Sequence, residues 1–152
     1  MTHNDNDAND IKLDEYIPFR LSILSRAVSL SLAKQYSRYF NITLPEWRVL
    51  AVLASQQPLT ANEMGDRTNL DKVKMSRAIN RMLTTGLLEK EKDPHDKRRT
   101  LLRVSSAGWD IYRRIVPIAL THQAELLSVL NPEERAMLST LINKLHSKAI
   151  KF

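Results

Sequence analysis

The chain has 152 residues, of which 43% are apolar and 26% are charged, and this composition is typical of one globular domain. It contains no cysteine, which excludes disulfides, thiolate metal sites and thiol-based redox sensing. The start of the chain lacks the basic and apolar segments of a signal peptide, and no apolar run reaches the roughly 18 residues of a membrane-spanning helix. We therefore expect a cytoplasmic protein with no membrane partner.

The formal net charge of +6 is unevenly distributed along the chain. Residues 1–19 are net acidic, and residues 1–13 are predicted to form a flexible acidic N-terminus. Residues 60–104 are the richest in basic side chains, with eleven Lys or Arg against seven acids. This basicity favours nucleic acid or another anionic partner, although a solvated basic face would give the same composition.

The first two predicted elements are helices. Apolar residues three or four positions apart predict a long amphipathic helix over residues 14–40, and its stripe is Leu21, Leu24, Val28, Leu32, Tyr36 and Tyr39. Thr43 followed by Glu46 is the pattern of a capping box, in which each side chain satisfies a backbone N–H of the other residue. This pattern predicts a second helix, which residues 56–58 end.

Two shorter helices are predicted next. Thr60 and Glu63 repeat the capping pattern and begin a short helix. The turn and cap at residues 69–71 then precede a helix over residues 72–85, which Gly86 ends.

The last part of the chain is predicted to contain a hairpin and two helices. Strand-like runs at 87–92 and 100–104 enclose a charged loop that contains proline, as in a β-hairpin. A helix over 105–130 follows, with a kink expected at Pro117. Asn131 caps the final helix, whose apolar stripe is Leu138, Leu141, Ile142 and Leu145. The predicted fold class is mostly α with a small β-hairpin.

Two short helices joined by a tight turn and followed by a hairpin are the layout of a winged helix-turn-helix. At about 100° per residue, Lys74, Arg77 and Arg81 fall on one side and Met75, Ile79 and Met82 fall on the opposite side. One face can therefore pack on the protein while the other faces DNA. The predicted contacts in this helix are Lys72, Val73, Lys74, Ser76, Arg77, Asn80 and Arg81.

Each of these contacts has its own chemistry. Arg77 is suited to the O6 and N7 atoms of guanine, and Val73 is suited to a thymine methyl group. Lys74 and Arg81 are suited to phosphates. The alternative is a basic helix face that is only solvated.

The predicted hairpin tip adds Lys97, Arg98 and Arg99, at a place where we expect that nothing structural requires them. An arginine at such a tip can enter a narrow minor groove. Asp96 opposes this role unless its carboxylate accepts a hydrogen bond from Arg98 and sets the direction of that side chain. We therefore add Asp96, Lys97, Arg98 and Arg99 to the predicted DNA contacts.

These residues resemble the MarR (multiple antibiotic resistance regulator) family of bacterial transcription factors. The resemblance is carried by LPEWRVLAVL, by the run from Leu70 through Ser76-Arg77 to Leu88, and by the Asp96-Lys97-Arg98 and Ser105-Ser106-Ala107-Gly108 segments. It covers about residues 14–150. It implies a homodimer with intertwined terminal helices and a near-palindromic operator of double-stranded DNA. The recognition helix falls on Lys72 to Thr85, and the wing Asp and Arg fall on Asp96 and Arg98.

The resemblance also implies a division of the chain. Residues 14–42 and 105–152 are expected to form a helical dimerisation region, and residues 43–104 a winged helix-turn-helix DNA-binding lobe. The long apolar stripes of the flanking helices agree with this, because helices far apart in sequence need partners to cover them. A monomer that buries all the stripes internally is the alternative.

Small-molecule control is implied by the resemblance as well. The family mode that remains without cysteine is a small aromatic or phenolic carboxylate, for which Arg20, Tyr36, Tyr39, Trp47 and Arg48 could supply a cation and aromatic walls. In the alternative, these aromatic residues are core and these arginines are solvated. We expect no metal and no cofactor, because His3, His95, His122 and His146 are dispersed.

Three functions were weighed. We expect a dimeric, sequence-specific DNA-binding regulator, a repressor that the ligand releases. An enzyme is not expected, because the sequence contains no catalytic motif such as a Gly-rich phosphate loop or a Ser/His/Asp constellation. An architectural nucleic-acid binder without sequence preference or ligand control is the alternative.

Overall fold

The structure of the protein is a computed structural model that describes residues 10–152. Its elements in chain order are α1 (Ile17–Ser37), α2 (Leu44–Ser55), α3 (Ala61–Thr68), α4 (Lys72–Thr84), β1 (Leu88–Lys92), β2 (Thr100–Val104), α5 (Ser106–Leu127) and α6 (Pro132–Ala149). The two strands pair antiparallel, with Leu88 opposite Val104 and Lys92 opposite Thr100. The predicted fold class is confirmed. Residues 1–9 of the predicted flexible N-terminus lie outside the described residues.

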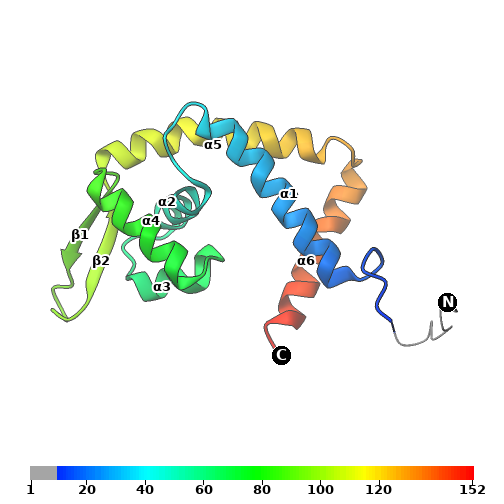
Figure 1. Cartoon of the computed structure of the whole chain (residues 1–152), viewed down its shortest axis with the longest axis horizontal. Coiled ribbons are helices and arrows are strands. Elements are labelled where there is room, and N and C mark those ends of the chain that lie inside the picture. Colours follow the sequence, from blue (N-terminus) through cyan, green and yellow to red (C-terminus); the bar gives the residue numbers. More distant parts are fainter. Residues whose placement is uncertain (1–9) are drawn as a thin grey trace, which may run out of the picture.

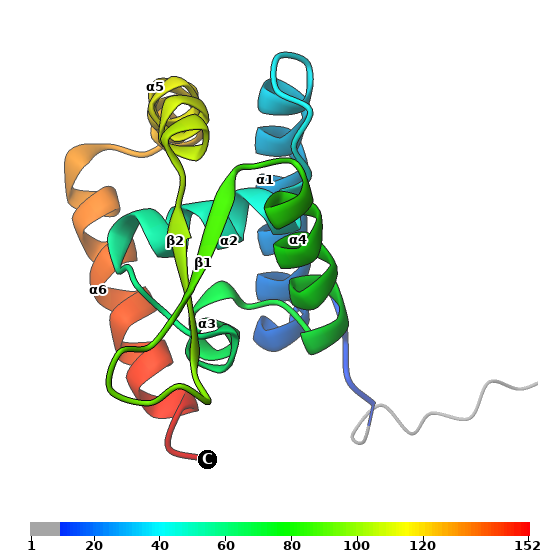
Figure 2. The ribbon, with the colours of Figure 1, turned by 90° about the vertical axis from the view of Figure 1, so that its left-hand side faces the viewer.

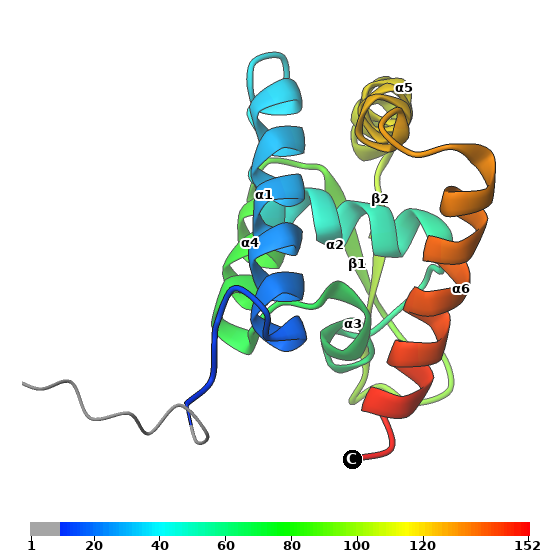
Figure 3. The same cartoon turned by 90° about the vertical axis from the view of Figure 1, so that its right-hand side faces the viewer.

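The elements are arranged around the long helix α5. Helices α2, α3 and α4 gather with the hairpin at one end of the molecule, and we call residues 43–104 the winged lobe (Figure 1). Helix α5 leaves the hairpin and runs to the other end, where α6 turns away from it (Figure 1). Helices α1 and α6 descend from opposite sides of α5 (Figure 3), and the hairpin crosses the face of the lobe that is turned away from them (Figure 2).

Local signals explain where most helices begin. The capping box of Thr60 and Glu63 is complete in α3, and Asn131 and Glu134 form another in α6. The box predicted for α2 is only half formed, because Thr43 accepts the Glu46 N–H but the Glu46 carboxylate does not bond the backbone of Thr43. The reason for this departure is an ion pair that is described below.

The two long helices differ from the prediction at their ends. Helix α1 begins at Ile17 rather than at residue 14, with Pro18 in its first turn, where a missing N–H costs little. It ends at Ser37, and a turn follows before Phe40. Helix α5 continues through Pro117 and ends at Leu127.

The hydrophobic core fills the winged lobe and reaches beyond it. Its fully enclosed side chains include Leu50, Leu53, Met64 and Met82 from the lobe. Tyr36 and Phe40 at the end of α1 and Ile115 of α5 belong to the same core. The core therefore extends past the predicted boundaries of the lobe and fixes it to both long helices.

The hairpin is joined tightly to α5. Gly86, with φ of 78°, allows the chain to leave α4, and the Ser105 hydroxyl donates to its carbonyl at 2.6 Å. The Ser105 N–H donates to the Leu87 carbonyl at 3.1 Å. Gly108 lies so close to Leu87, the residue before β1, that a Cβ atom there would come within 2.2 Å of the Leu87 oxygen. Only glycine fits at that position of α5.

Candidate nucleic-acid interface

The turn between α3 and α4 places the second helix at the surface. Asn69 ends α3 in the left-handed conformation, with φ of 52°, which asparagine tolerates better than most residues. Arg48 of α2 donates to the Asn69 carbonyl at 3.3 Å and to the Ser29 hydroxyl of α1 at 3.1 Å. Asp71 then caps α4 by accepting the Lys74 N–H at 2.8 Å. The turn is therefore fixed from both sides.

Helix α4 has two distinct faces, as predicted. The residues Met75, Ala78, Ile79 and Met82 are buried against the lobe. The predicted contacts Lys72, Val73, Lys74, Ser76, Arg77, Asn80 and Arg81 are all exposed. We call α4 the recognition helix, because this arrangement leaves its polar and basic side chains available to a groove of DNA.

The three cations expected to contact DNA have different surroundings. Lys74 lies 3.8 Å from the Asp71 carboxylate, and both side chains are well exposed. Within residues 10–152, the Arg77 side chain has no ion-pair or hydrogen-bond partner. Arg81 pairs with the buried Glu46 carboxylate at 3.2 Å and lies 3.5 Å from the Asn41 side-chain oxygen. The pattern of the sequence gave no indication of the Glu46 pairing.

The tip of the hairpin contains the pair that the sequence predicted. One carboxylate oxygen of Asp96 accepts the backbone N–H of Arg98 at 3.1 Å and its side-chain Nε–H at 3.2 Å. The Arg98 side chain is otherwise 93% exposed. The Nε atom of its guanidinium is therefore held by Asp96, and the rest of the guanidinium is open to solvent.

The prediction that nothing structural requires the tip arginines is wrong for Arg99. Its guanidinium donates to Glu63 of α3 at 2.9 Å and pairs with the buried Asp93 carboxylate at 3.5 Å. Arg99 therefore anchors the hairpin to α3, and its contact with DNA remains a prediction for the part of its side chain that stays exposed. The sequence could not reveal the anchor, because Glu63 is 36 positions away.

The carboxylates of this anchor have lowered pKa values. The Thr60 N–H, with help from Arg99, holds the pKa of Glu63 below its ordinary value of 4.5. The His95 and Asp96 backbone N–H groups, together with Arg99, hold the pKa of Asp93 below 3.8. Both side chains therefore carry their negative charge at neutral pH.

Comparison with known proteins identifies this arrangement. The family model described as MarR family matches residues 40–99, which contain the recognition helix and the hairpin tip. The HTH-type transcriptional regulator YkoM of Bacillus subtilis is 30% identical over 115 residues, which cover 74% of this chain and 73% of that protein. The chain belongs to the MarR family.

Solved structures agree with the MarR-family fold. The PcaV transcriptional regulator of Streptomyces coelicolor, in complex with its natural ligand, is 26% identical, covers 92% of this chain and 98% of its own, and superposes with a TM-score of 0.75. Bordetella bronchiseptica BpsR, whose DNA binding is regulated by 6-hydroxynicotinic acid, is 21% identical with a TM-score of 0.80 and covers 91% and 98%. The relatives are transcription regulators, so this chain is a DNA-binding transcription regulator and not an enzyme.

Two further observations concern partners of this MarR-family chain. None of the helices within residues 10–152 combines the length and the apolar character needed to cross a bilayer. The same residues contain no group of three or more His, Asp or Glu side chains that could hold a metal ion.

The five residues predicted to bind a ligand lie in different surroundings. Trp47 packs between Tyr36 and Tyr112, with ring centroids 6.1 and 5.9 Å away, so Tyr36 and Trp47 belong to the packed interior. Arg48 is engaged with Ser29 and Asn69, and Arg20 lies exposed near the start of α1. That these residues line one ligand pocket therefore stays a prediction.

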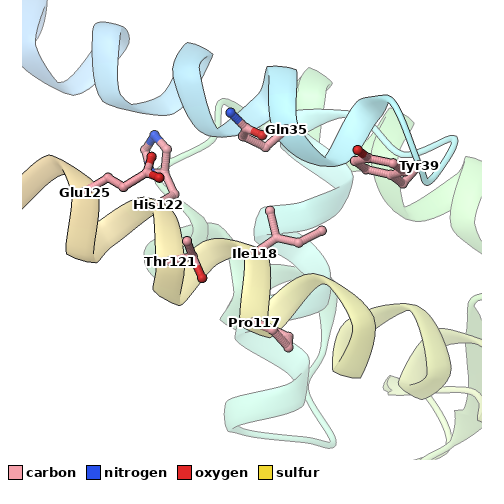
Figure 4. Close-up of a pocket in the computed structure, with 7 residues that line it drawn as sticks. All are labelled: Gln35, Tyr39, Pro117, Ile118, Thr121, His122 and Glu125. Atoms are coloured by element: carbon pink, nitrogen blue, oxygen red, sulfur yellow. The ribbon is translucent and has the colours of Figure 1, made fainter.

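Two of the cavities beside α1 also reach another helix. The α1–α5 cavity, of about 360 Å³, is lined by Gln35, Tyr39, Pro117, Ile118, Thr121, His122 and Glu125 (Figure 4). Beside it, His122 lies 2.6 Å from the Ser31 hydroxyl and connects the two helices. The α1–α2 cavity, of about 440 Å³, is lined by Leu30, Ala33, Lys34, Tyr36, Ser37, Asn41, Ile42, Thr43 and Leu44. Burial raises the pKa of Tyr36 to about 12, and its hydroxyl is buried without a hydrogen-bond partner in the described residues.

Proposed function

We propose that the chain is a homodimeric, sequence-specific DNA-binding repressor that a small aromatic or phenolic carboxylate releases from its operator. The observation that carries the DNA-binding part is the recognition helix, whose basic side chains are exposed while its apolar side chains are buried. The oriented Arg98 at the hairpin tip supports a second contact in the adjacent minor groove. Because the partner is chromosomal DNA, cytoplasmic localisation is part of the proposal.

The proposal that two copies associate rests on the flanking helices. No residue of α6 is buried in the single chain. Its apolar side chains Met137, Leu138, Leu141, Ile142 and Leu145 are exposed, as are Ile17, Phe19, Leu21 and Leu24 of α1. Single helices are marginally stable in water without packing, and symmetric dimers are the commonest oligomers. We therefore propose residues 14–42 and 105–152 as the dimerisation region and residues 43–104 as the DNA-binding lobe.

A ligand site is proposed in the α1–α2 cavity. Its volume of about 440 Å³ is within the usual range of small-molecule sites. Lys34 supplies a cation for a carboxylate, and Leu30 and Leu44 are among its apolar lining residues. The α1–α5 cavity is less suited to an anion, because Glu125 lines it. The regulation of BpsR by 6-hydroxynicotinic acid, an aromatic carboxylate, supports this ligand class.

The decisive experiment is a footprint on DNA upstream of the gene, followed by competition with unrelated duplex. We expect a near-palindromic protected site whose binding survives competition. Affinity should drop about 10³-fold or more between roughly 50 and 200 mM salt, because several phosphates are neutralised on each lobe. Equal affinity for operator and unrelated DNA would instead support an architectural binder.

Control by a ligand is tested separately. Phenolic and benzoic-type carboxylates are screened for release of the operator, and Lys34→Ala is expected to weaken the response while leaving DNA affinity unchanged. Arg48→Ala is a poor test, since loss of its bonds to Ser29 and Asn69 would disturb the turn before α4. If no compound of this class changes DNA affinity or melting temperature, this part of the proposal is wrong.

A further inference from the structure

Glu46 differs from two other glutamates at the same position of a helix. Glu63 in α3 and Glu134 in α6 each accept the backbone N–H of their cap residue, at 2.8 and 2.9 Å. Glu46 in α2 instead accepts the Thr43 hydroxyl at 2.9 Å and pairs with Arg81 of the recognition helix at 3.2 Å. Its carboxylate therefore joins the cap residue of its own helix to α4.

The two partners of this ion pair are buried to different extents. The Glu46 side chain is 3% exposed, whereas the Arg81 side chain is 44% exposed. A buried carboxylate loses its hydration, and apolar residues of similar volume often stabilise a fold at least as well as such a pair. A gain in stability therefore does not by itself explain the ion pair. The exposed part of the Arg81 side chain remains free to contact a partner in solution.

Arg81 lines a hollow between the start of α2 and the recognition helix. The hollow has a volume of about 190 Å³ and is lined by Thr43, Pro45, Glu46, Lys74, Arg77, Ala78 and Arg81. Three of these side chains are cations, which suits a backbone phosphate of DNA. A guanidinium has more N–H donors than one carboxylate uses, so Arg81 can bond Glu46 and a phosphate together.

We propose that Glu46 is a positioning residue, which orients Arg81 toward a DNA phosphate in this hollow. The inference rests on the proposed DNA-binding function. Without Glu46, the long Arg81 side chain must be ordered when DNA binds, and affinity falls. If Glu46 acted only by charge, its removal would raise affinity, because each lobe would become more positive. Positioning and simple electrostatics therefore predict opposite signs.

The first test is Glu46→Gln, which keeps the shape of the side chain and removes its charge. We expect binding to the duplex that the wild type prefers to weaken about threefold to tenfold, as the cost of ordering one long side chain implies. Glu89→Gln is the matched control, because Glu89 is an exposed carboxylate of β1 without an ion-pair partner in residues 10–152. This control should bind all DNA slightly more tightly.

The second test is a double-mutant cycle with Arg81→Lys, which keeps the positive charge and loses the planar fork. We expect Glu46→Gln to weaken binding by less than about twofold when Arg81→Lys is already present. Melting temperatures are measured alongside, because a purely structural pair would lower the melting temperature in step with the DNA affinity, whereas loss of a positioned phosphate contact weakens binding to preferred and random duplex alike at a nearly unchanged melting temperature. A melting temperature that falls in step with the affinity, fully additive losses, or tighter binding by Glu46→Gln would overturn the inference. If the wild type binds all duplexes equally well, the proposed sequence specificity is refuted. The double-mutant cycle is then measured on any one of these duplexes, and the same outcomes decide the inference about Glu46.

Discussion

The winged lobe and the flanking helices bury their apolar residues in different ways. The lobe encloses Leu50, Met64 and Met82 completely within one chain. Helix α6, in contrast, has a complete capping box and a continuous apolar stripe but no buried residue. Capping and periodicity therefore mark where α6 forms, and we propose that a second copy covers its apolar stripe. The predictions below test this contrast, from the largest expected effect to the smallest.

The largest effect is expected from Leu141→Asp in the exposed stripe of α6. A charge buried without a partner at an interface costs about 3 to 5 kcal/mol, so the dimer should dissociate. Sedimentation at micromolar concentration should then show a species near 17.5 kDa. Asn143→Asp on the opposite side of α6 is the control and should remain dimeric. A dimeric Leu141→Asp would place the interface elsewhere.

Gly108→Ala tests the packing of the winged lobe against the start of α5 within one chain. The new Cβ would lie 2.2 Å from the Leu87 oxygen, so the start of α5 must move away from the hairpin. We expect a loss of about 1 to 3 kcal/mol or more in the free energy of unfolding, measured by thermal denaturation. At Gly65 a Cβ would meet only the end of Met75, at 3.9 Å, and Gly65→Ala should stabilise α3 by about 0.5 to 1 kcal/mol. Equal melting temperatures for the two variants would contradict the close packing.

Arg77→Ala tests the exposed face of the recognition helix. We expect operator binding to weaken by about 1 to 3 kcal/mol, with preference lost at one base pair in each half-site. Arg67→Ala removes the same charge from α3, where Arg67 lines a hollow with Ser55 of α2, and serves as the control. Binding to operator variants measures both. If Arg77→Ala weakens operator and random DNA equally, Arg77 contacts a phosphate rather than a base.

Asp96→Asn and Arg98→Ala test the hairpin tip. Because Asp96 holds the Arg98 Nε–H at 3.2 Å, either change should weaken operator binding by about 0.5 to 1.5 kcal/mol. The double variant should be little worse than Arg98→Ala alone, and folding should be nearly unchanged. Tighter binding by Asp96→Asn would show that its carboxylate only repels DNA.

The smallest effect concerns the anchor between Arg99 and α3 at low pH. Glu63 and Asp93 have pKa values lowered by folding, so their stabilising interactions are fully present above their ordinary pKa values of 4.5 and 3.8. This contribution is lost as the pH falls through the lower values of the folded state. Protection of the hairpin amides, taken relative to the intrinsic exchange rate at each pH, should therefore fall in acid before that of the α6 amides, and Arg99→Ala should remove part of this pH dependence.

Local features of this fold were predictable from the sequence. The caps at Thr60 and Asp71, the stop at Gly86 and the two faces of α4 each depend on residues a few positions apart. The Asp96–Arg98 pair is of the same kind, since the residues are two positions apart. Short-range geometry determines all of these, and a linear pattern contains it.

Contacts between distant segments were not predictable in the same way. Glu46 satisfies a capping pattern, and nothing nearby indicates that its partner is Arg81. Arg48 was interpreted as a ligand residue, although it joins Ser29 to a carbonyl 21 positions along the chain. These side chains are long and charged, so their partners are chosen by the packing of helices and not by local preference.

The length of α5 has a geometric consequence for the operator. Its 22 residues give a rod of about 33 Å between the hairpin and α6. One end of this rod is locked to the hairpin by Ser105 and Gly108, and the other leads directly into α6. In the proposed dimer, the number of residues in α5 therefore sets how each lobe is rotated about the helix axis relative to the dimerisation region. Inserting one residue would turn a lobe by about 100° around the rod and misalign both half-sites, even though every DNA contact residue is unchanged.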